Sequence, residues 1–170
     1  MAGRVLVNTG KGKGKTTAAL GTALRAAGQG LRVCLFQFMK GGLPTGESSL
    51  LERLGIEQHR LGTGFSWTKE SWEEDQALAA KGWALAREAI LGGVYDLVVL
   101  DEINYVIGYG LLNAEEVAAV IKKRPPKLHL ILTGRGLAPA IAELADTITE
   151  MVPLKHAFDS GTKATKGIEF

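Results

Sequence analysis

The chain has little that could cross-link it and nothing that would hold it in a membrane. Cys34 is the only cysteine among 170 residues, so no disulfide can form within the chain. No apolar stretch is long enough to span a bilayer, and the sequence shows no signal peptide. These absences predict a cytoplasmic protein held together by a hydrophobic core. Cys34 lies inside an apolar strand pattern and is expected to be a buried thiol.

The chain also lacks a strong charge of one sign, low-complexity tracts and internal repeats. Its 20 basic and 18 acidic residues leave a formal net charge of +2 and are mixed along the sequence, which argues against a nucleic-acid surface. The basic run 122–124 falls where a helix is expected to end, and cations there compensate the helix dipole. The length predicts a single domain over residues 1–170.

Apolar strand patterns alternate with helical patterns along the chain. This alternation predicts an α/β fold, with a mostly parallel central sheet flanked by helices. The expected strands are residues 4–8, 32–38, 56–60, 96–100, 128–133 and 147–152. The expected helices are residues 15–27, 48–54, 71–91, 113–122 and 139–145. The first helix should bury Leu20, Ala23, Leu24 and Ala27, and the long helix should bury Ala79, Trp83, Ala86 and Ile90. Asn113 and Glu116 resemble a capping box.

The segment after the first apolar run reads as a phosphate-binding loop. Its glycines let successive backbone N–H groups face an anion, and the following helix turns its positive end to the same point. The spacing departs from the usual Gly-x₄-Gly-Lys-Ser/Thr. The residue five positions before Gly14 is Thr9, and the nearest glycine, Gly10, comes one position later. The alternative to a phosphate-binding role is a flexible glycine loop on the surface. The candidate ligands of a nucleoside polyphosphate are Thr9, Gly10, Lys11, Gly12, Lys13, Gly14, Lys15, Thr16 and Thr17.

Two acids end the most apolar strand pattern of the chain. Asp101 and Glu102 follow the run 97–100, and ligands of parallel sheets lie at the carboxyl ends of the strands. Carboxylates there could hold Mg²⁺ together with the Thr16 hydroxyl. An acid that merely meets solvent at the end of a strand would give the same pattern. Together with the loop, the pair favours a metal role for Thr16, Asp101 and Glu102.

Two arginines are candidate partners of the phosphates. Arg135 lies between Gly134 and Gly136 after an expected strand, where it could reach back over the site. A guanidinium keeps its charge and can contact two phosphate oxygens at once. Arg25, on the first helix, is the weaker candidate because helix surfaces commonly carry arginine.

The remaining aromatic and histidine residues give no firm assignment on their own. Phe65 and Trp67 lie in a glycine-bounded loop, where packing over the core and contact with a flat ligand explain them equally well. The three histidines are scattered, and each is expected to be structural: His59, His129 and His156. No Ser-His-Asp order is evident, so nucleophilic catalysis of that type is not indicated.

The combination of motifs resembles one family, the P-loop-type ATP:corrinoid adenosyltransferases. The resemblance covers nearly the whole chain, and the odd spacing of the phosphate loop is the one that this family has. The matching segments are residues 9–17, 37–41, 62–67, 101–102, 133–136 and 155–164.

That resemblance implies a reaction and an architecture. The Co(I) of a reduced corrinoid attacks the 5′-carbon of ATP and triphosphate leaves, in the biosynthesis or salvage of adenosylcobalamin. The family implies a RecA-like P-loop domain, a homodimer, and ATP bound in reverse of the usual orientation. It also implies Mg²⁺ or Mn²⁺ as the metal and a flavoprotein as the reductant. Many relatives carry a segment before the first strand that can fold over the corrinoid. Here the strand begins almost at Met1, so the loops and the tail are expected to close the site.

The resemblance also implies roles for particular residues. It places the triphosphate on residues 10–17, Arg25 and Arg135, with Lys15 as a catalytic contact. It places Phe65 and Trp67 against the lower axial face of cobalt, where aromatic rings exclude water without ligating the metal. An absent axial donor makes Co(II) easier to reduce.

Two other classes of protein would contain the same phosphate-binding loop. A generic P-loop NTPase or kinase would direct attack to the γ-phosphorus and release ADP or orthophosphate. A non-catalytic ATP-binding or corrinoid-carrier module would give no turnover with reduced cobalamin. The products of an incubation with ATP and reduced corrinoid separate these readings.

Overall fold

The strands form one parallel sheet. The computed structural model describes residues 2–41, 45–62 and 73–168. In this part of the chain six strands lie in the order β3-β2-β4-β5-β1-β6, and every neighbouring pair is parallel. This confirms the predicted α/β class. The strands are β1 (Val5–Thr9), β2 (Val33–Gln37), β3 (Glu57–Arg60), β4 (Leu97–Asp101), β5 (His129–Thr133) and β6 (Thr147–Glu150).

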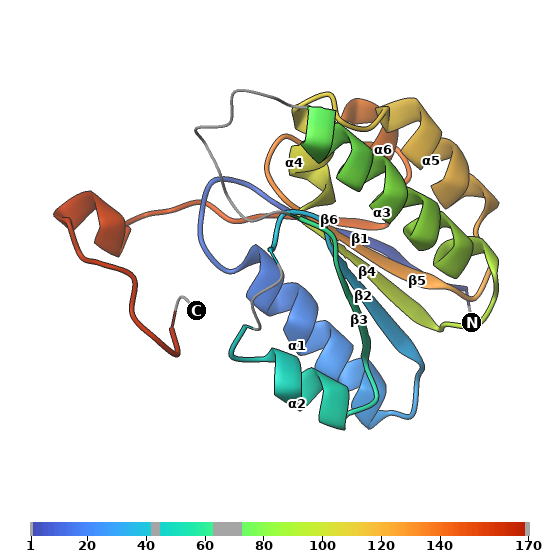
Figure 1. Cartoon of the computed structure of the whole chain (residues 1–170), viewed down its shortest axis with the longest axis horizontal. Coiled ribbons are helices and arrows are strands. Elements are labelled where there is room, and N and C mark those ends of the chain that lie inside the picture. The colour runs from blue at the N-terminus through green and yellow to red at the C-terminus, as the bar shows by residue number, and fades with distance from the viewer. Residues whose placement is uncertain (1, 42–44, 63–72, 169–170) are drawn as a thin grey trace.

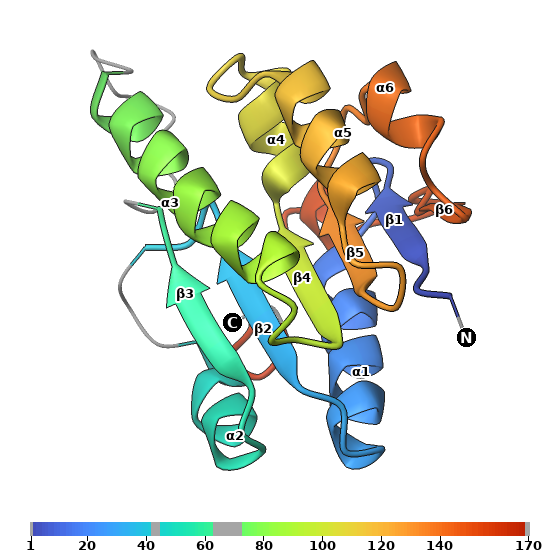
Figure 2. The ribbon, with the colours of Figure 1, turned by 90° about the vertical axis from the view of Figure 1, so that its right-hand side faces the viewer.

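Helices cover both faces of the sheet (Figures 1 and 2). One face carries α1 (Lys15–Gly28) and α2 (Ser48–Arg53). The other carries α3 (Glu73–Leu91), α4 (Ile103–Gly108), α5 (Ala114–Lys123) and α6 (Pro139–Ala142). A 3₁₀ helix, η1 (Ala157–Ser160), lies in the tail that extends away from the sheet in Figure 1. None of the helices in the described ranges combines the length and apolarity needed to cross a bilayer.

Each central strand contributes side chains to two cores. In β4, Val98 and Leu100 pack in the core beneath α3 and α5, whereas Leu97 and Val99 pack in the core beneath α1 and α2. This alternation explains why the strand reads as a continuous apolar run, since both of its faces are covered. The predicted stripe of α3 is confirmed, because all four of its residues are buried: Ala79, Trp83, Ala86 and Ile90.

The buried face of α1 differs from the expected one. The helix buries Ala19, Ala23 and Ala26, whereas Leu24 is 51% exposed. The prediction of a buried Leu24 was therefore wrong. Alanines let the helix backbone approach the sheet closely, and the larger Leu24 then lies on the solvent side together with Arg25.

The start of α5 shows half of the predicted capping box. The Asn113 side chain accepts the N–H groups of Glu115 (2.8 Å) and Glu116 (3.2 Å), as an N-cap should. The Glu116 carboxylate has a different use from the one expected, because it accepts the indole N–H of Trp83 on α3 at 2.9 Å. Glu116 thereby joins two helices of the same layer.

The parallel topology collects the chemically active segments at one edge of the sheet. The phosphate loop follows β1, the acids follow β4, and the turn with Arg135 follows β5. β5 lies between β1 and β4, so all three segments are neighbours at the carboxyl ends of their strands. The sequence pattern showed no sign of α4, which begins directly after the two acids.

Candidate functional site

The phosphate loop ends at the uncapped amino terminus of α1. Gly14 is the N-cap residue, in a left-handed conformation with φ 112°, and it offers no side chain to the helix. The first turn of α1 carries no acidic side chain. The positive end of the helix dipole is therefore not compensated by the helix itself, which suits an anionic ligand.

The loop is held against the segment that follows β6. The Gly12 N–H donates to the Met151 carbonyl at 2.6 Å, and the Met151 N–H donates to the Thr9 carbonyl at 2.9 Å. A Cβ at Gly10 would lie 2.5 Å from the Met151 oxygen, so this close approach requires glycine. Met151 thus fixes the curve of the loop, and the Gly12 N–H anchors the loop in this structure.

Lys15 is the buried cation of the site. Its ammonium donates to the Gly12 carbonyl at 2.7 Å, and the residue is 8% exposed. Burial lowers the pKa of Lys15 from its ordinary value, while the carboxylates of Glu102 and Asp101 act in the opposite direction. The side chain is therefore poised inside the curve of the loop, where a phosphate oxygen could replace the carbonyl contact.

Asp101 is fully buried and accepts hydrogen bonds from three side chains. Its Oδ1 accepts the hydroxyls of Thr16 at 2.8 Å and Thr133 at 2.7 Å. Its Oδ2 accepts the Gln37 amide at 3.5 Å. The network joins α1, β5 and β2 through one carboxylate at the end of β4. It confirms the predicted proximity of Thr16 to the acid pair.

Glu102 has a strained backbone and an unpaired carboxylate oxygen. It adopts φ 66°, the one positive φ recorded for a non-glycine residue in the described ranges. Its N–H donates to the Thr133 hydroxyl at 2.8 Å, which helps to hold that conformation. Its Oε2 is buried and has no hydrogen-bond partner within the described part of the chain. Strain and an orphaned acceptor in one residue are typical of a binding site.

The electrostatic surroundings of Glu102 favour a nearby cation. Burial raises the pKa of the Glu102 carboxyl to about 7, and the neighbouring Asp101 charge adds to the rise. Lys15, Lys40 and Arg135 act against it. A divalent cation would satisfy the orphaned oxygen and would stabilise the ionised form, so the residues present fit a metal such as Mg²⁺.

This raised pKa predicts a pH-dependent stability that Glu102→Gln removes. The raised pKa contributes stability that is fully present below 4.5, the ordinary value for glutamate, and is lost as pH rises through about 7. Relative to the variant, the wild type should lose on the order of 2 kcal/mol of unfolding free energy across that window. Urea denaturation without nucleotide or divalent cation, below and above the window, measures it. Parallel pH profiles of the two proteins would contradict the assignment.

Two further cations lie near the acids, and one of them was missed. Arg135 donates to the Lys11 carbonyl at 3.3 Å, so it reaches the phosphate loop as expected. Lys40, which follows β2, forms an ion pair with Glu47 at 3.2 Å, and its charge tends to lower the pKa of Glu102. The sequence places Lys40 in the segment 37–41 of the family resemblance, and that was the available signal.

Other predicted residues lie farther away or outside the described ranges. Arg25 is exposed in the last turn of α1, and ten residues of helix place it about 15 Å along the axis from Lys15. The structure does not bring it to the loop. Lys13 donates to the Ile168 carbonyl at 3.1 Å, which ties the tail to the loop. Phe65 and Trp67 lie outside the described residues.

Comparison with known proteins identifies relatives along the full length of the chain. Residues 1–170 match the family described as ATP:corrinoid adenosyltransferase BtuR/CobO/CobP. A corrinoid adenosyltransferase of Escherichia coli K12 is 46% identical, with 99% of this chain and 86% of that protein covered. The corrinoid adenosyltransferase CobA of Salmonella typhimurium is 45% identical with the same coverage. A corrinoid adenosyltransferase of Pseudomonas aeruginosa is 42% identical over 99% of this chain and 84% of its own length.

A solved structure supports the fold independently. The flagellar accessory protein FlaH from Methanocaldococcus jannaschii matches with a TM-score of 0.58 at 13% identity, over 88% of this chain and 71% of FlaH. At that identity the likeness shows the fold alone, and it confirms the predicted α/β fold with a parallel central sheet flanked by helices. The family match over residues 1–170 and the relatives above 40% identity carry the assignment further: this chain belongs to the ATP:corrinoid adenosyltransferase family.

Proposed function

We propose that this enzyme transfers the 5′-deoxyadenosyl group of ATP to the Co(I) of a reduced corrinoid. The family match along all 170 residues carries this proposal. The cobalt supplies the electron pair of the new Co–C bond. The bond between C5′ and the phosphate oxygen breaks, and triphosphate leaves with the electron pair of that broken C–O bond. No general base is required, because Co(I) is itself the nucleophile.

The phosphate loop would bind and stabilise the departing triphosphate. The amino terminus of α1, the Lys15 ammonium and the Arg135 guanidinium are cationic or electropositive groups at one edge of the sheet. Charge develops on the leaving oxygens in the transition state, so preorganised positive groups there lower the barrier. Residues 9–17 and Arg135 are the proposed triphosphate ligands. Arg25 remains a proposed ligand from the family resemblance, although it is about 15 Å along α1 from Lys15 in this chain.

Thr16, Asp101 and Glu102 would hold Mg²⁺ or Mn²⁺. The fit rests on the orphaned Glu102 oxygen and on the Thr16 contact with Asp101. The ion would neutralise charge on the triphosphate. Asp101 fixes the Thr16 hydroxyl, and the charges of Asp101, Lys15 and Arg135 all act on the Glu102 carboxylate.

Glu102→Gln should raise the Mg²⁺ concentration needed for half-maximal turnover by at least roughly tenfold, because it weakens a metal ligand. The KM for corrinoid should change much less, since the substitution does not alter the corrin pocket. A Mg²⁺ titration of both proteins measures the effect. An unchanged titration would transfer the metal role to Asp101 or to water alone.

Phe65 and Trp67 are proposed to act at the reduction step. Aromatic rings beneath cobalt would displace its lower axial donor and favour four-coordinate Co(II), whereas Co(I) already lacks strong axial ligands. The double substitution Phe65→Ala with Trp67→Ala should therefore impair the reaction started from Co(II) with a mild reductant. It should spare much of the reaction started from chemically made Co(I). An equal fractional loss in both assays, on one preparation with saturating ATP, would assign the aromatics to general binding.

The proposal also includes an electron donor, an oligomeric state and a location in the cell. A flavoprotein is the proposed source of the electron that converts Co(II) to Co(I). The enzyme is proposed to act as a cytoplasmic homodimer, as its family resemblance implies. Sedimentation of the purified protein tests the dimer.

The phosphate product tests the proposed reaction against the kinase reading. The enzyme is incubated anaerobically with ATP, Mg²⁺ and chemically reduced cobalamin, and the phosphates are separated by ion exchange. Triphosphate is the expected product. ADP or orthophosphate would support attack at phosphorus and would overturn the proposal.

A further inference from the structure

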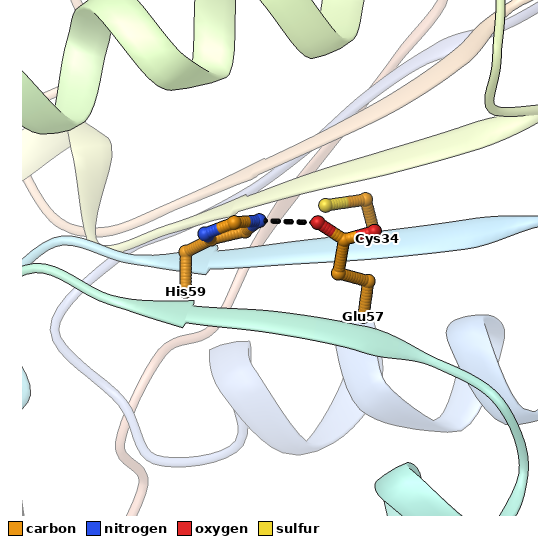
Figure 3. A group of neighbouring side chains, drawn as sticks. All are labelled: Cys34, Glu57 and His59. Atoms are coloured by element: carbon orange, nitrogen blue, oxygen red, sulfur yellow. Dashed lines mark hydrogen bonds and ion pairs between the residues drawn. The ribbon is translucent and has the colours of Figure 1, made fainter.

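A second polar cluster lies on the sheet away from the phosphate loop. It joins Cys34 of β2 with Glu57 and His59 of β3, the strand at the edge of the sheet (Figure 3). The thiol sulfur, a carboxylate oxygen and a ring nitrogen all lie within 4.8 Å of one another. Cys34 is three residues before Gln37, so the cluster is about 10 Å along the strand from the Asp101 network.

The strand register brings these residues to one face. Cys34 is paired with Glu57, and Phe36 with His59, in adjacent parallel strands. Because side chains alternate along a strand, Cys34, Glu57 and His59 project to the same side. The histidines look scattered in the sequence, because the 24 residues between Cys34 and His59 hide this pairing.

Contacts within the cluster and contacts with Phe36 and Tyr95 hold the side chains in place. The His59 ring stacks on Phe36, with ring centroids 4.6 Å apart and an interplanar angle of 7°. The His59 Nε2 lies 2.7 Å from Oε1 of Glu57. The Tyr95 hydroxyl, from the segment before β4, donates to the other oxygen of Glu57. Contacts from residues outside the ligand set, such as those of Phe36 and Tyr95, orient the ligands of metal sites.

The cluster is buried on the side of β2 and partly exposed on the side of β3. Cys34 is fully buried, whereas the side chains of His59 and Glu57 are 30% and 50% exposed. An ion held among them would lie at the margin of the core and could be reached from solvent. Its fourth coordination position would face water.

The donor set selects the kind of ion. A thiolate, an imidazole and a carboxylate are the ligands that Zn²⁺ takes in proteins, and three protein ligands with one open position are a common arrangement. Mg²⁺ prefers oxygen ligands alone, so the same ion is not expected at both sites. We propose that Cys34, Glu57 and His59 form a Zn²⁺ site separate from the phosphate loop.

Binding would exchange one set of contacts for another. The thiol proton passes to solvent as the sulfur coordinates, and the contact between His59 and Glu57 is replaced by a bond from each to the ion. The ion would then bridge β3, a strand of four residues, to β2. Because only the folded chain brings the three ligands together, Zn²⁺ should raise the melting temperature of the enzyme.

Co²⁺ provides a spectroscopic probe of the site in the full-length enzyme. Cys34 is the only cysteine, so a sulfur-to-cobalt charge-transfer band in the near ultraviolet reports this site alone. The expected result is one such band per chain, reversed by one equivalent of Zn²⁺. The band should disappear in Cys34→Ser and persist in Asp101→Asn, which alters the phosphate-loop acids.

Zn²⁺ affinity, measured by competition with a chromophoric chelator, completes the test. His59→Gln and Glu57→Gln should each weaken binding at least about tenfold. The matched controls Glu52→Gln, on neighbouring α2, and His129→Gln, at the start of β5, should leave it unchanged. Both test positions are partly exposed on an edge strand, so they remain informative if Cys34→Ser fails to fold. No sulfur band in the wild type would overturn the proposal. So would binding that survives the ligand substitutions, or binding that is lost in Asp101→Asn.

Discussion

Replacing Lys15 with alanine should lower the turnover rate about a hundredfold while leaving the enzyme folded. A preorganised contact to developing charge is worth roughly 3 kcal/mol in a site of this kind. Lys15 is buried inside the phosphate loop, and its ammonium already donates to the Gly12 carbonyl at 2.7 Å. That position commits the charge of Lys15 to the loop.

The effect should appear in kcat more than in the KM for ATP, because the charge on triphosphate grows as the C5′–O bond breaks. The assay is initial-rate kinetics with preformed Co(I), with circular dichroism and urea denaturation to establish the fold. Lys81→Ala, at an exposed position on α3, is the matched control and should keep normal rates. Near-normal activity in well-folded Lys15→Ala would reject the assigned role of the loop.

Replacing Asp101 with alanine should lower the free energy of unfolding by about 3 kcal/mol. The substitution leaves three donors without their acceptor: the half-buried Thr16 hydroxyl, the buried Thr133 hydroxyl and the buried Gln37 amide. Asp101→Asn retains Oδ1 as the acceptor for both hydroxyls, so its loss should be nearer to about 1 kcal/mol. The alanine variant would lose the side-chain hydrogen bonds that link α1, β5 and β2 to Asp101, whereas the asparagine variant would keep those from the two hydroxyls.

Urea denaturation of the two variants measures this difference. Glu88→Ala, an exposed acid on α3, should change stability by less than about 0.5 kcal/mol and is the control. Both Asp101 variants should lose most of their turnover, because both remove the charge beside Thr16. Equal stability of the alanine and asparagine variants would show that the network does not join the three strands and helix as described.

The parts of the fold that depend on local pattern were predictable from the sequence. The apolar runs of β4 and β5 indicated strands of a mostly parallel sheet, and glycines after β1 indicated the phosphate loop. Leu24 shows where periodicity fails. Its position fits an apolar face, but the alanines of α1 bring the helix so close to the sheet that Leu24 is left outside.

The site was predictable in its ligand types but not in its electrostatics. The acids after β4 could be identified, whereas the left-handed backbone and raised pKa of Glu102 depend on neighbours from other segments. Met151 and Lys40 were missed for the same reason, because each approaches the loop or the acids through folding alone. The pairing of Cys34 with the edge strand β3 likewise follows from sheet register, which the sequence does not specify.

The most direct test of the proposed reaction follows the carbon that moves. Wild-type enzyme is given Mg²⁺, anaerobic Co(I) corrinoid and ATP labelled at the 5′-carbon, and the visible spectrum is recorded while the label is traced. Adenosyl transfer predicts that the Co(I) spectrum is replaced by that of a light-sensitive alkylcorrinoid carrying the label, with one triphosphate formed for each Co–C bond. An unchanged Co(I) spectrum, with the label recovered in ADP, would contradict it.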